Sequence, residues 1–214
     1  MSNVDEKSSV RQTILMRALE LFSAKGYEGV SVNELTEASG ITKPTLYYYF
    51  GSKEGLYEAV CQLFYNQLNE LIAENAAYKP NPKVYSEDVH RTLTKVTRAY
   101  FSFAKTNEAF YRIILANLSM PSSSAVFKIV EKYHFTQFDI IENMFRNMAK
   151  THGNLRGKSQ MLSWALIGTI NSYVGLSFSG ALRTRAQGEV SKSLAVNDRT
   201  VAEIVHQFMH GIYA

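Results

Sequence analysis

The stretch that decides the fold is residues 31–55, SVNELTEASGITKPTLYYYFGSKEG. Ser31, followed three positions later by Glu34, forms a capping box, which predicts the start of a short helix. Thr42 is predicted to cap a second short helix, in which Pro44 is tolerated because it lies in the first turn. Two short capped helices around a glycine-containing turn are typical of a helix-turn-helix.

The segments on either side are also predicted to be helical. Residues 7–25 are expected to form an amphipathic helix, because apolar residues recur on one face at helical spacing. Ser52 can cap a long helix from Lys53 to about Ala77, and the polar stretch 185–197 is interpreted as a loop. Five further helices are predicted near 86–105, 107–118, 122–151, 157–184 and 198–212, with Asn107, Ser122 and Asn197 or Asp198 as candidate caps. Since alternating β-branched runs are absent from the sequence, the chain is predicted to be all-α, with about nine helices.

Charge alone says little about the partner. The net charge of +4 is mild and is only weak evidence for a nucleic-acid partner. Residues 1–55 carry six basic and seven acidic side chains. DNA binding by this segment therefore has to depend on where the charges lie rather than on their sum.

The chain is expected to be cytoplasmic and to have no membrane span. The one cysteine, Cys61, cannot form an internal disulfide, which favours a reducing compartment. Residues 1–12 are polar and lack the apolar core of a signal peptide. Residues 159–182 carry no charge and are long enough to cross a bilayer. The polar Gln160 and Asn171, together with three glycines, instead favour a helix buried on all sides.

The second short helix carries the candidate DNA-reading residues. In a helix-turn-helix this helix enters the major groove and presents its N-terminal residues to base edges. Lys43 can donate to O6 and N7 of guanine. Pro44 and the methyl group of Thr45 offer apolar contact to a thymine methyl, and Tyr47 lies on the same short segment.

The three adjacent tyrosines of this helix cannot all be buried. Leu46 and Phe50, one turn apart, are the natural pair to face the core. We therefore expect one or two of the tyrosines to be exposed, with hydroxyls available to phosphate oxygens. Lys53, at the start of the next helix, can hold a phosphate together with the helix amides. A purely structural helix pair is the alternative.

The residues of this region resemble those of a known family. The stretch GITKPTLYYYFGSKEGL at 40–56 closely resembles the signature of the tetracycline-repressor (TetR) family. The preceding VNELTEAS at 32–39 matches too, as does ALELF at 18–22 followed by Gly26-Tyr27. The resemblance covers about residues 10–65.

The resemblance implies an all-helical homodimer that is a DNA-binding transcriptional regulator. It implies a helix-turn-helix DNA-binding domain in residues 1–52 and an effector-binding and dimerisation domain in residues 53–214. Most such proteins are repressors that a small molecule releases from a palindromic operator in double-stranded DNA. The family often has a small residue or Gln where Lys43 stands, so the base preference is less predictable. The expected DNA-binding residues are Val32, Asn33, Thr42, Lys43, Pro44, Thr45, Tyr47, Tyr48, Tyr49 and Lys53.

A stripe of small residues in the uncharged segment predicts a dimer interface. Small side chains at alternating spacings of three and four let two helices approach closely. Tight packing within one subunit is the alternative, and the resemblance favours the dimer, because the last two helices of the family usually form a four-helix bundle with those of the partner. The stripe consists of Ala165, Gly168, Ser172, Gly175 and Ser179.

An effector pocket is expected between the central helices, where bundles place apolar cavities with a few polar groups. Aromatic residues are numerous, so an apolar or aromatic effector is expected, although most of these side chains also suit a core. Asn171 is a lone amide in an apolar run and needs a partner, either across a dimer or on a ligand. The candidates are Tyr100, Phe101, Phe110, Tyr111, Phe135, Phe138, Trp164 and Asn171.

No catalytic site, metal site or cofactor is expected. His206 and His210 are one helical turn apart, a spacing that can bind metal, but Gln207 stands where a metalloprotease needs Glu. Residues 153–159, GNLRGKS, resemble a phosphate loop that is one residue short and follows a helix instead of a strand. The alternative to a regulator is a helical interaction or ligand-binding protein without working DNA recognition.

Overall fold

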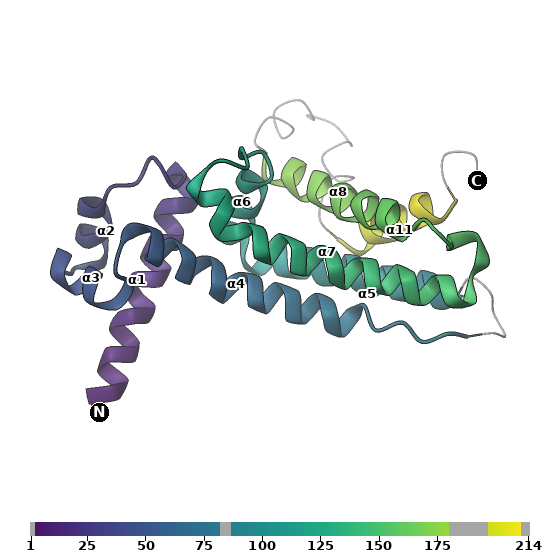
Figure 1. Ribbon diagram of the computed structural model, residues 1–214, viewed down its shortest axis with the longest axis horizontal. Coiled ribbons are helices and arrows are strands. Elements are labelled where there is room, and N and C mark those ends of the chain that lie inside the picture. Colours follow the sequence, from purple (N-terminus) through teal and green to yellow (C-terminus); the bar gives the residue numbers. More distant parts are fainter. Residues whose placement is uncertain (1–2, 82–86, 180–196, 211–214) are drawn as a thin grey trace. The chain divides into compact units, whose positions relative to one another are not determined.

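The computed structural model describes residues 3–81, 87–179 and 197–210 (Figure 1). Within these ranges the chain forms nine α-helices and one short 3-10 helix, and no strand, so the predicted all-α fold is confirmed. The helices are α1 Asn3–Lys25, α2 Val32–Ser39, α3 Lys43–Phe50, α4 Lys53–Asn75, α5 Glu87–Thr106, α6 Glu108–Asn117, α7 Ala125–Thr151, η1 Gly153–Leu155, α8 Ser159–Phe178 and α11 Asp198–His210.

Helix α8 is shorter than the sequence predicts. The expected helix over 157–184 ends at Phe178, because Ser179 adopts an extended backbone with φ −80° and ψ 122°. The loop predicted at 185–197 lies, apart from Asn197, outside the described residues. No helix in the described part of the chain is both long and apolar enough to cross a membrane.

Side-chain caps mark where two later helices begin. Ser124, rather than the predicted Ser122, caps α7, since its hydroxyl accepts the amide N–H of Phe127 at 3.0 Å. The predicted cap Asn197 is confirmed, because its side-chain oxygen accepts the amide N–H of Thr200 at 3.0 Å. Each bond satisfies an amide that the first turn of a helix leaves without an intrahelical partner.

The helix-turn-helix forms by the local bonds that the sequence predicts. The Ser31 hydroxyl accepts the amide N–H of Glu34 at 3.2 Å, and the Glu34 carboxylate accepts the Ser31 amide N–H at 2.8 Å. Gly40 ends α2 in the left-handed conformation, with φ 64°, where a glycine has no steric penalty. Thr42 then caps α3 by accepting the amide N–H of Thr45.

Contacts divide the chain into two compact units. The first comprises residues 1–67 and 107–133, and the second comprises residues 68–106 and 134–214. Helices α4 and α7 therefore each contribute residues to both units. The division at residue 52 that the sequence predicts is a functional one and remains a prediction.

The first unit is built on α1, which contacts both α2 and α6. An aromatic cluster fills its centre: the ring of Tyr57 meets Phe22 and Tyr27 edge-on, with centroids 5.1 and 5.0 Å away. The Tyr57 hydroxyl also forms a buried hydrogen bond with the Asn117 side chain, with Oη 3.1 Å from Oδ1. Leu35 of α2 and Leu46 of α3 are fully buried in this unit, which fixes which sides of the two short helices remain outside.

The second unit packs α5 against α8 and α11. The prediction that this uncharged helix is buried on all sides is wrong for the single chain: α8 buries one side and exposes the other. The core side chains come from five helices: Leu68 and Ile72 of α4, Leu93, Val96, Tyr100 and Phe103 of α5, Ile141, Met144, Phe145 and Met148 of α7, Leu166, Ile170 and Val174 of α8, and Val201, Ile204 and Val205 of α11.

The junction between α3 and α4 requires a glycine at position 55. A Cβ atom added to Gly55 would lie 2.1 Å from the carbonyl oxygen of Phe50. Alanine ordinarily stabilises a helix interior by about 0.5–1 kcal/mol relative to glycine. We expect Gly55→Ala instead to lower the free energy of unfolding, measured in urea, by more than about 1 kcal/mol, because the backbone has to shift.

Gly153→Ala is the matched control for this substitution. A Cβ at Gly153, an exposed glycine of η1, meets no atom within 4 Å, so this variant is expected to change the free energy of unfolding little. Equal effects of the two substitutions would contradict the role given to the close approach at Gly55.

Candidate functional site

Helix α3 presents its first turn outward. Lys43 and Pro44 are exposed, and Leu46 is fully buried beneath them. Two of the tyrosines are exposed as predicted, Tyr47 by 46% and Tyr48 by 72%. The outer side of α3 therefore carries one cation, one rigid apolar ring and two phenols, a combination suited to base edges and phosphates.

The end of α3 is held by aromatic contacts. The ring of Tyr49, half-buried, meets the exposed Tyr48 ring edge-on at 5.1 Å between centroids and lies 6.2 Å from the Phe50 ring. The guanidinium of Arg11, from α1, lies 5.4 Å from the centroid of the Phe50 ring. Sequence reasoning missed Arg11, because its place beside α3 depends on how α1 packs and no local pattern marks it.

The other predicted DNA-binding residues lie at the starts of helices. Asn33 is exposed and Val32 is half-buried at the start of α2. The hydroxyls of Thr42 and Thr45 lie 2.9 Å apart at the start of α3. Both hydroxyls thus already have a local partner; Thr42 is exposed and Thr45 is half-buried.

Lys53 is positioned by a neighbouring aromatic ring. Its ammonium lies 4.2 Å from the centroid of Tyr27, a cation–π contact. Burial raises the pKa of Tyr27, and a hydrogen bond to Glu54 adds to this effect. Hydrogen bonds from its own amide, from Tyr27 and from Ser52 lower the pKa of Glu54. Ser52 caps α4 as predicted, accepting the amide N–H of Gly55 at 3.0 Å.

The predicted effector residues do not lie in one unit. Phe110 and Tyr111 belong to the first unit, where Phe110 packs on Phe64 and Tyr65 with both centroids 5.0 Å away. The other six belong to the second unit: Tyr100, Phe101, Phe138 and Asn171 are buried, and Phe135 and Trp164 are more than half exposed.

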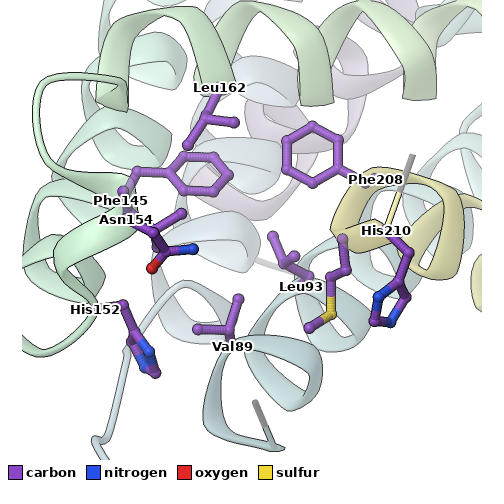
Figure 2. Close-up of a pocket in the computed structure, with 10 residues that line it drawn as sticks. Val89, Leu93, Phe145, His152, Asn154, Leu162, Phe208 and His210 are labelled. Carbon is purple, nitrogen blue, oxygen red and sulfur yellow. The ribbon is translucent and has the colours of Figure 1, made fainter. Parts of the chain in front are cut away.

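A cavity of about 220 Å³ lies in the second unit (Figure 2). None of the predicted effector residues lines it. Its lining comes from five separate elements, mixing seven apolar side chains with two histidines and an asparagine. The residues are Val89, Leu93, Phe145, His152, Asn154, Leu155, Leu162, Phe208, Met209 and His210.

A buried polar cluster borders this cavity at His152. The Asp88 carboxylate accepts hydrogen bonds from the Tyr78 hydroxyl at 2.6 Å and from the backbone amides of Asn81 and Val89 at 2.9 and 2.7 Å. Nε2 of His152 lies 3.0 Å from Oδ1 of the same carboxylate. Burial acts to raise the pKa of Asp88, but these hydrogen bonds outweigh it and lower the pKa to about 2.

The predicted histidine pair lies on α11. The rings of His206 and His210 have centroids 4.8 Å apart. Among the described residues no group of three or more His, Cys, Asp or Glu is arranged to hold a metal ion.

The predicted stripe of small residues lies on the outer side of α8. Ala165, Gly168 and Ser172 are exposed, and Gly175 and Ser179 are half-buried. Large apolar side chains flank the stripe on the same helix: Met161 is 60% exposed, Trp164 58% and Leu176 43%. A groove of about 730 Å³ runs along α8 and α11 past Trp164, Gly168 and Ser172. An uncharged outer surface with exposed large side chains is typical of a protein interface.

Parts of this sequence are similar to known transcriptional regulators. Residues 14–60 match the sequence profile of the family described as "Bacterial regulatory proteins, tetR family". The negative regulator IcaR of the biofilm operon icaADBC in Staphylococcus aureus is 26% identical over 148 residues, 65% of this chain and 77% of IcaR. The transcriptional activator FasR of Mycolicibacterium smegmatis is 28% identical over 134 residues, 61% of this chain and 58% of FasR.

A solved structure shares the fold at low sequence identity. FadR from Bacillus subtilis, in complex with stearoyl-CoA, superposes with a TM-score of 0.72 at 16% identity. The match covers 94% of this chain and 99% of FadR.

The Asp88 cluster generates a pH dependence of stability. The folded pKa of about 2 lies below the ordinary value of 3.8, so the stabilisation is complete above pH about 4 and is lost as the pH falls toward about 2. We expect Asp88→Asn to lower the free energy of unfolding by about 2 kcal/mol at neutral pH, and by progressively less below pH about 4. Urea unfolding at a series of pH values measures this difference.

Asp139→Asn, at an exposed position of α7, is the matched control and is expected to change stability little at any of these pH values. A difference for Asp88→Asn that stayed constant down to pH about 2.5 would contradict the assignment of the low pKa to this carboxyl.

Proposed function

We propose that the chain is a member of the TetR family of DNA-binding transcriptional regulators, and that it is a homodimeric repressor released from a palindromic operator by a small-molecule effector. In this proposal residues 1–52 bind DNA, and residues 53–214 bind the effector and form the dimer. The observation that carries it is the outward first turn of α3, where Lys43, Pro44 and Tyr47 surround the buried anchor Leu46.

DNA recognition follows from this placement. A recognition helix reads the major groove with its N-terminal residues, so Lys43 and Tyr47 face base edges, and Pro44 and the Thr45 methyl contact thymine methyl groups. Phosphates are held by Lys53 and by the exposed tyrosine hydroxyls. Arg11 adds a further cation beside the end of α3.

The dimer follows from the exposed side of α8. A single helix-turn-helix reads one half-site, and two copies about one DNA turn apart, roughly 34 Å, read a palindrome. The uncharged face around Gly168 gives the second copy a surface against which its own helix can pack closely.

Effector release follows from a difference in affinity. An effector that binds better to a dimer whose recognition helices do not fit successive grooves weakens operator binding, typically by about 1–3 kcal/mol.

Support for repression comes from the relatives. IcaR is a negative regulator and matches a larger share of both chains than the activator FasR does. FadR binds stearoyl-CoA, which supports a small-molecule effector in general. The protein acts in the cytoplasm, where its operator is, and catalyses no reaction.

DNA binding by α3 is tested with Lys43→Ala and Tyr47→Ala. Both side chains are exposed, so the variants are expected to fold normally. Each substitution is expected to weaken binding to an operator selected from a random duplex pool by about tenfold or more, since a base contact contributes about 1–3 kcal/mol. Lys53→Ala, which removes the cation assigned to phosphate, would instead reduce the salt dependence of binding by about one unit of slope.

Lys105→Ala, at an exposed lysine in the last turn of α5, is the control and is expected to bind the operator like the wild-type protein. Full binding by the Lys43→Ala, Tyr47→Ala double variant would remove α3 as the recognition helix and favour a helical binding protein without DNA recognition.

The dimer surface is tested with Gly168→Arg. The exposed glycine has open space at its Cβ position, so arginine fits the single chain but places a charge and a long side chain where the partner helix would lie. The variant is expected to fold, and to be a monomer by sedimentation equilibrium at concentrations where the wild-type protein is a dimer.

Gly153→Arg is the matched control, because a Cβ at this exposed glycine in η1 also meets no atom within 4 Å. It is expected to remain a dimer. A Gly168→Arg protein that stays dimeric would place the interface elsewhere.

A further inference from the structure

The cavity in the second unit has the size and lining of a binding site for one class of small molecule. We propose that it binds a compact aromatic monocarboxylate, the size of benzoate, with the ring inside and the carboxylate at its mouth. This rests on the proposed function only in one respect, namely that the bound molecule acts as the effector.

The volume sets the size of the ligand. A protein cavity of about 150 Å³ lined by apolar side chains holds one benzene molecule. By proportion, the 220 Å³ found here holds about nine non-hydrogen atoms. An eighteen-carbon acyl chain like that of the stearoyl-CoA bound to FadR does not fit in this space.

The walls favour an aromatic ring. Phe145 of α7 and Phe208 of α11 both line the cavity, with ring centroids 5.9 Å apart and planes tilted by 32°. The two rings contact each other and form one aromatic wall, and Figure 2 shows Leu93 and Val89 on the side away from Leu162, so that apolar side chains border the cavity next to this wall. Met209 adds a thioether, and both aromatic edges and sulfur interact favourably with an inserted ring.

The polar groups of the lining favour an anion. Figure 2 shows His152 and His210 at opposite edges of the cavity, and among the described residues that line it none is acidic. The exposed Arg156 directly follows the lining residue Leu155 in the chain, and the exposed Lys158 comes three residues after it. His210 is itself exposed, which places an imidazole that can donate to a carboxylate at the mouth.

The Asp88 cluster makes the cavity rigid at the edge formed by His152, across from His210. A carboxylate with a low pKa only accepts hydrogen bonds, so Nε2 of His152, 3.0 Å from it, carries a proton directed at Asp88. The His152 ring is thereby fixed in one orientation and serves as a wall. The carboxylate of the ligand is therefore assigned to the His210 edge.

The test is calorimetric titration of the full-length protein with benzoate, without DNA. We expect one benzoate per chain with a Kd below about 1 mM. Val89→Phe fills the cavity and is expected to weaken binding at least tenfold. Ile140→Phe, at a half-buried position of α7 that does not line the cavity, is the matched control and is expected to bind like the wild-type protein.

The carboxylate position is tested with His210→Ala, which is expected to weaken benzoate binding about tenfold through loss of one charge-assisted hydrogen bond. His90→Ala, at an exposed histidine of α5 outside the cavity, is its control.

If Val89→Phe proves unfolded by circular dichroism, Leu155→Phe fills the same cavity from η1.

Three results would overturn the proposal: no benzoate binding below about 10 mM, equal binding by the filled and control variants, or stearoyl-CoA binding that the filled variant abolishes. Benzoate binding by a protein that binds no operator would support the cavity and contradict the proposed function. Operator binding by a protein that binds no benzoate would support the proposed function and contradict the cavity as a benzoate site.

Discussion

The capping of short helices by side chains is the constraint on which the DNA-binding region depends. Helices α2 and α3 have only eight residues each, well below the roughly 12–15 residues at which an isolated helix becomes stable in water. Ser31 and Thr42 satisfy amides that would otherwise lose their hydrogen bonds, and Leu35 and Leu46 are fully buried. With the caps defining where each helix starts and the leucines defining which side faces inward, Lys43 and Tyr47 have to lie outside.

A second constraint acts in the second unit, where a carboxylate is buried. Asp88 is tolerated there because four groups donate to it, from the segment after α4, from the start of α5 and from the residue after α7. Removal of one donor would leave the buried charge less well compensated, which is costly. The same bonds orient His152 and so shape one end of the cavity. The polar cluster and the cavity therefore share two residues: His152, and Val89, whose backbone amide donates to Asp88 and whose side chain lines the cavity.

Helix α8 illustrates the limit of pattern reasoning. An uncharged helix with small residues at helical spacing predicts close packing but does not say on which side the packing lies. The structure buries Leu166, Ile170 and Val174 and exposes Ala165, Gly168 and Ser172. Trp164 shows the same limit: an aromatic residue in an apolar run suits an effector pocket, yet it lies on the outer side of α8 against Phe138, with centroids 4.5 Å apart.

The sequence by itself determined the all-α fold, the helix-turn-helix and the exposed tyrosines of α3, because caps, turns and amphipathic spacing act between residues only three or four positions apart. The tertiary structure alone decided where the cavity lies, since its lining joins Val89 to His210 through five elements. It also decided the pairing of Asp88 with His152, 64 positions away in the chain, and the place of Arg11 beside Phe50. Such contacts are set by how helices pack, and the packing energy depends on all partners at once rather than on any local segment.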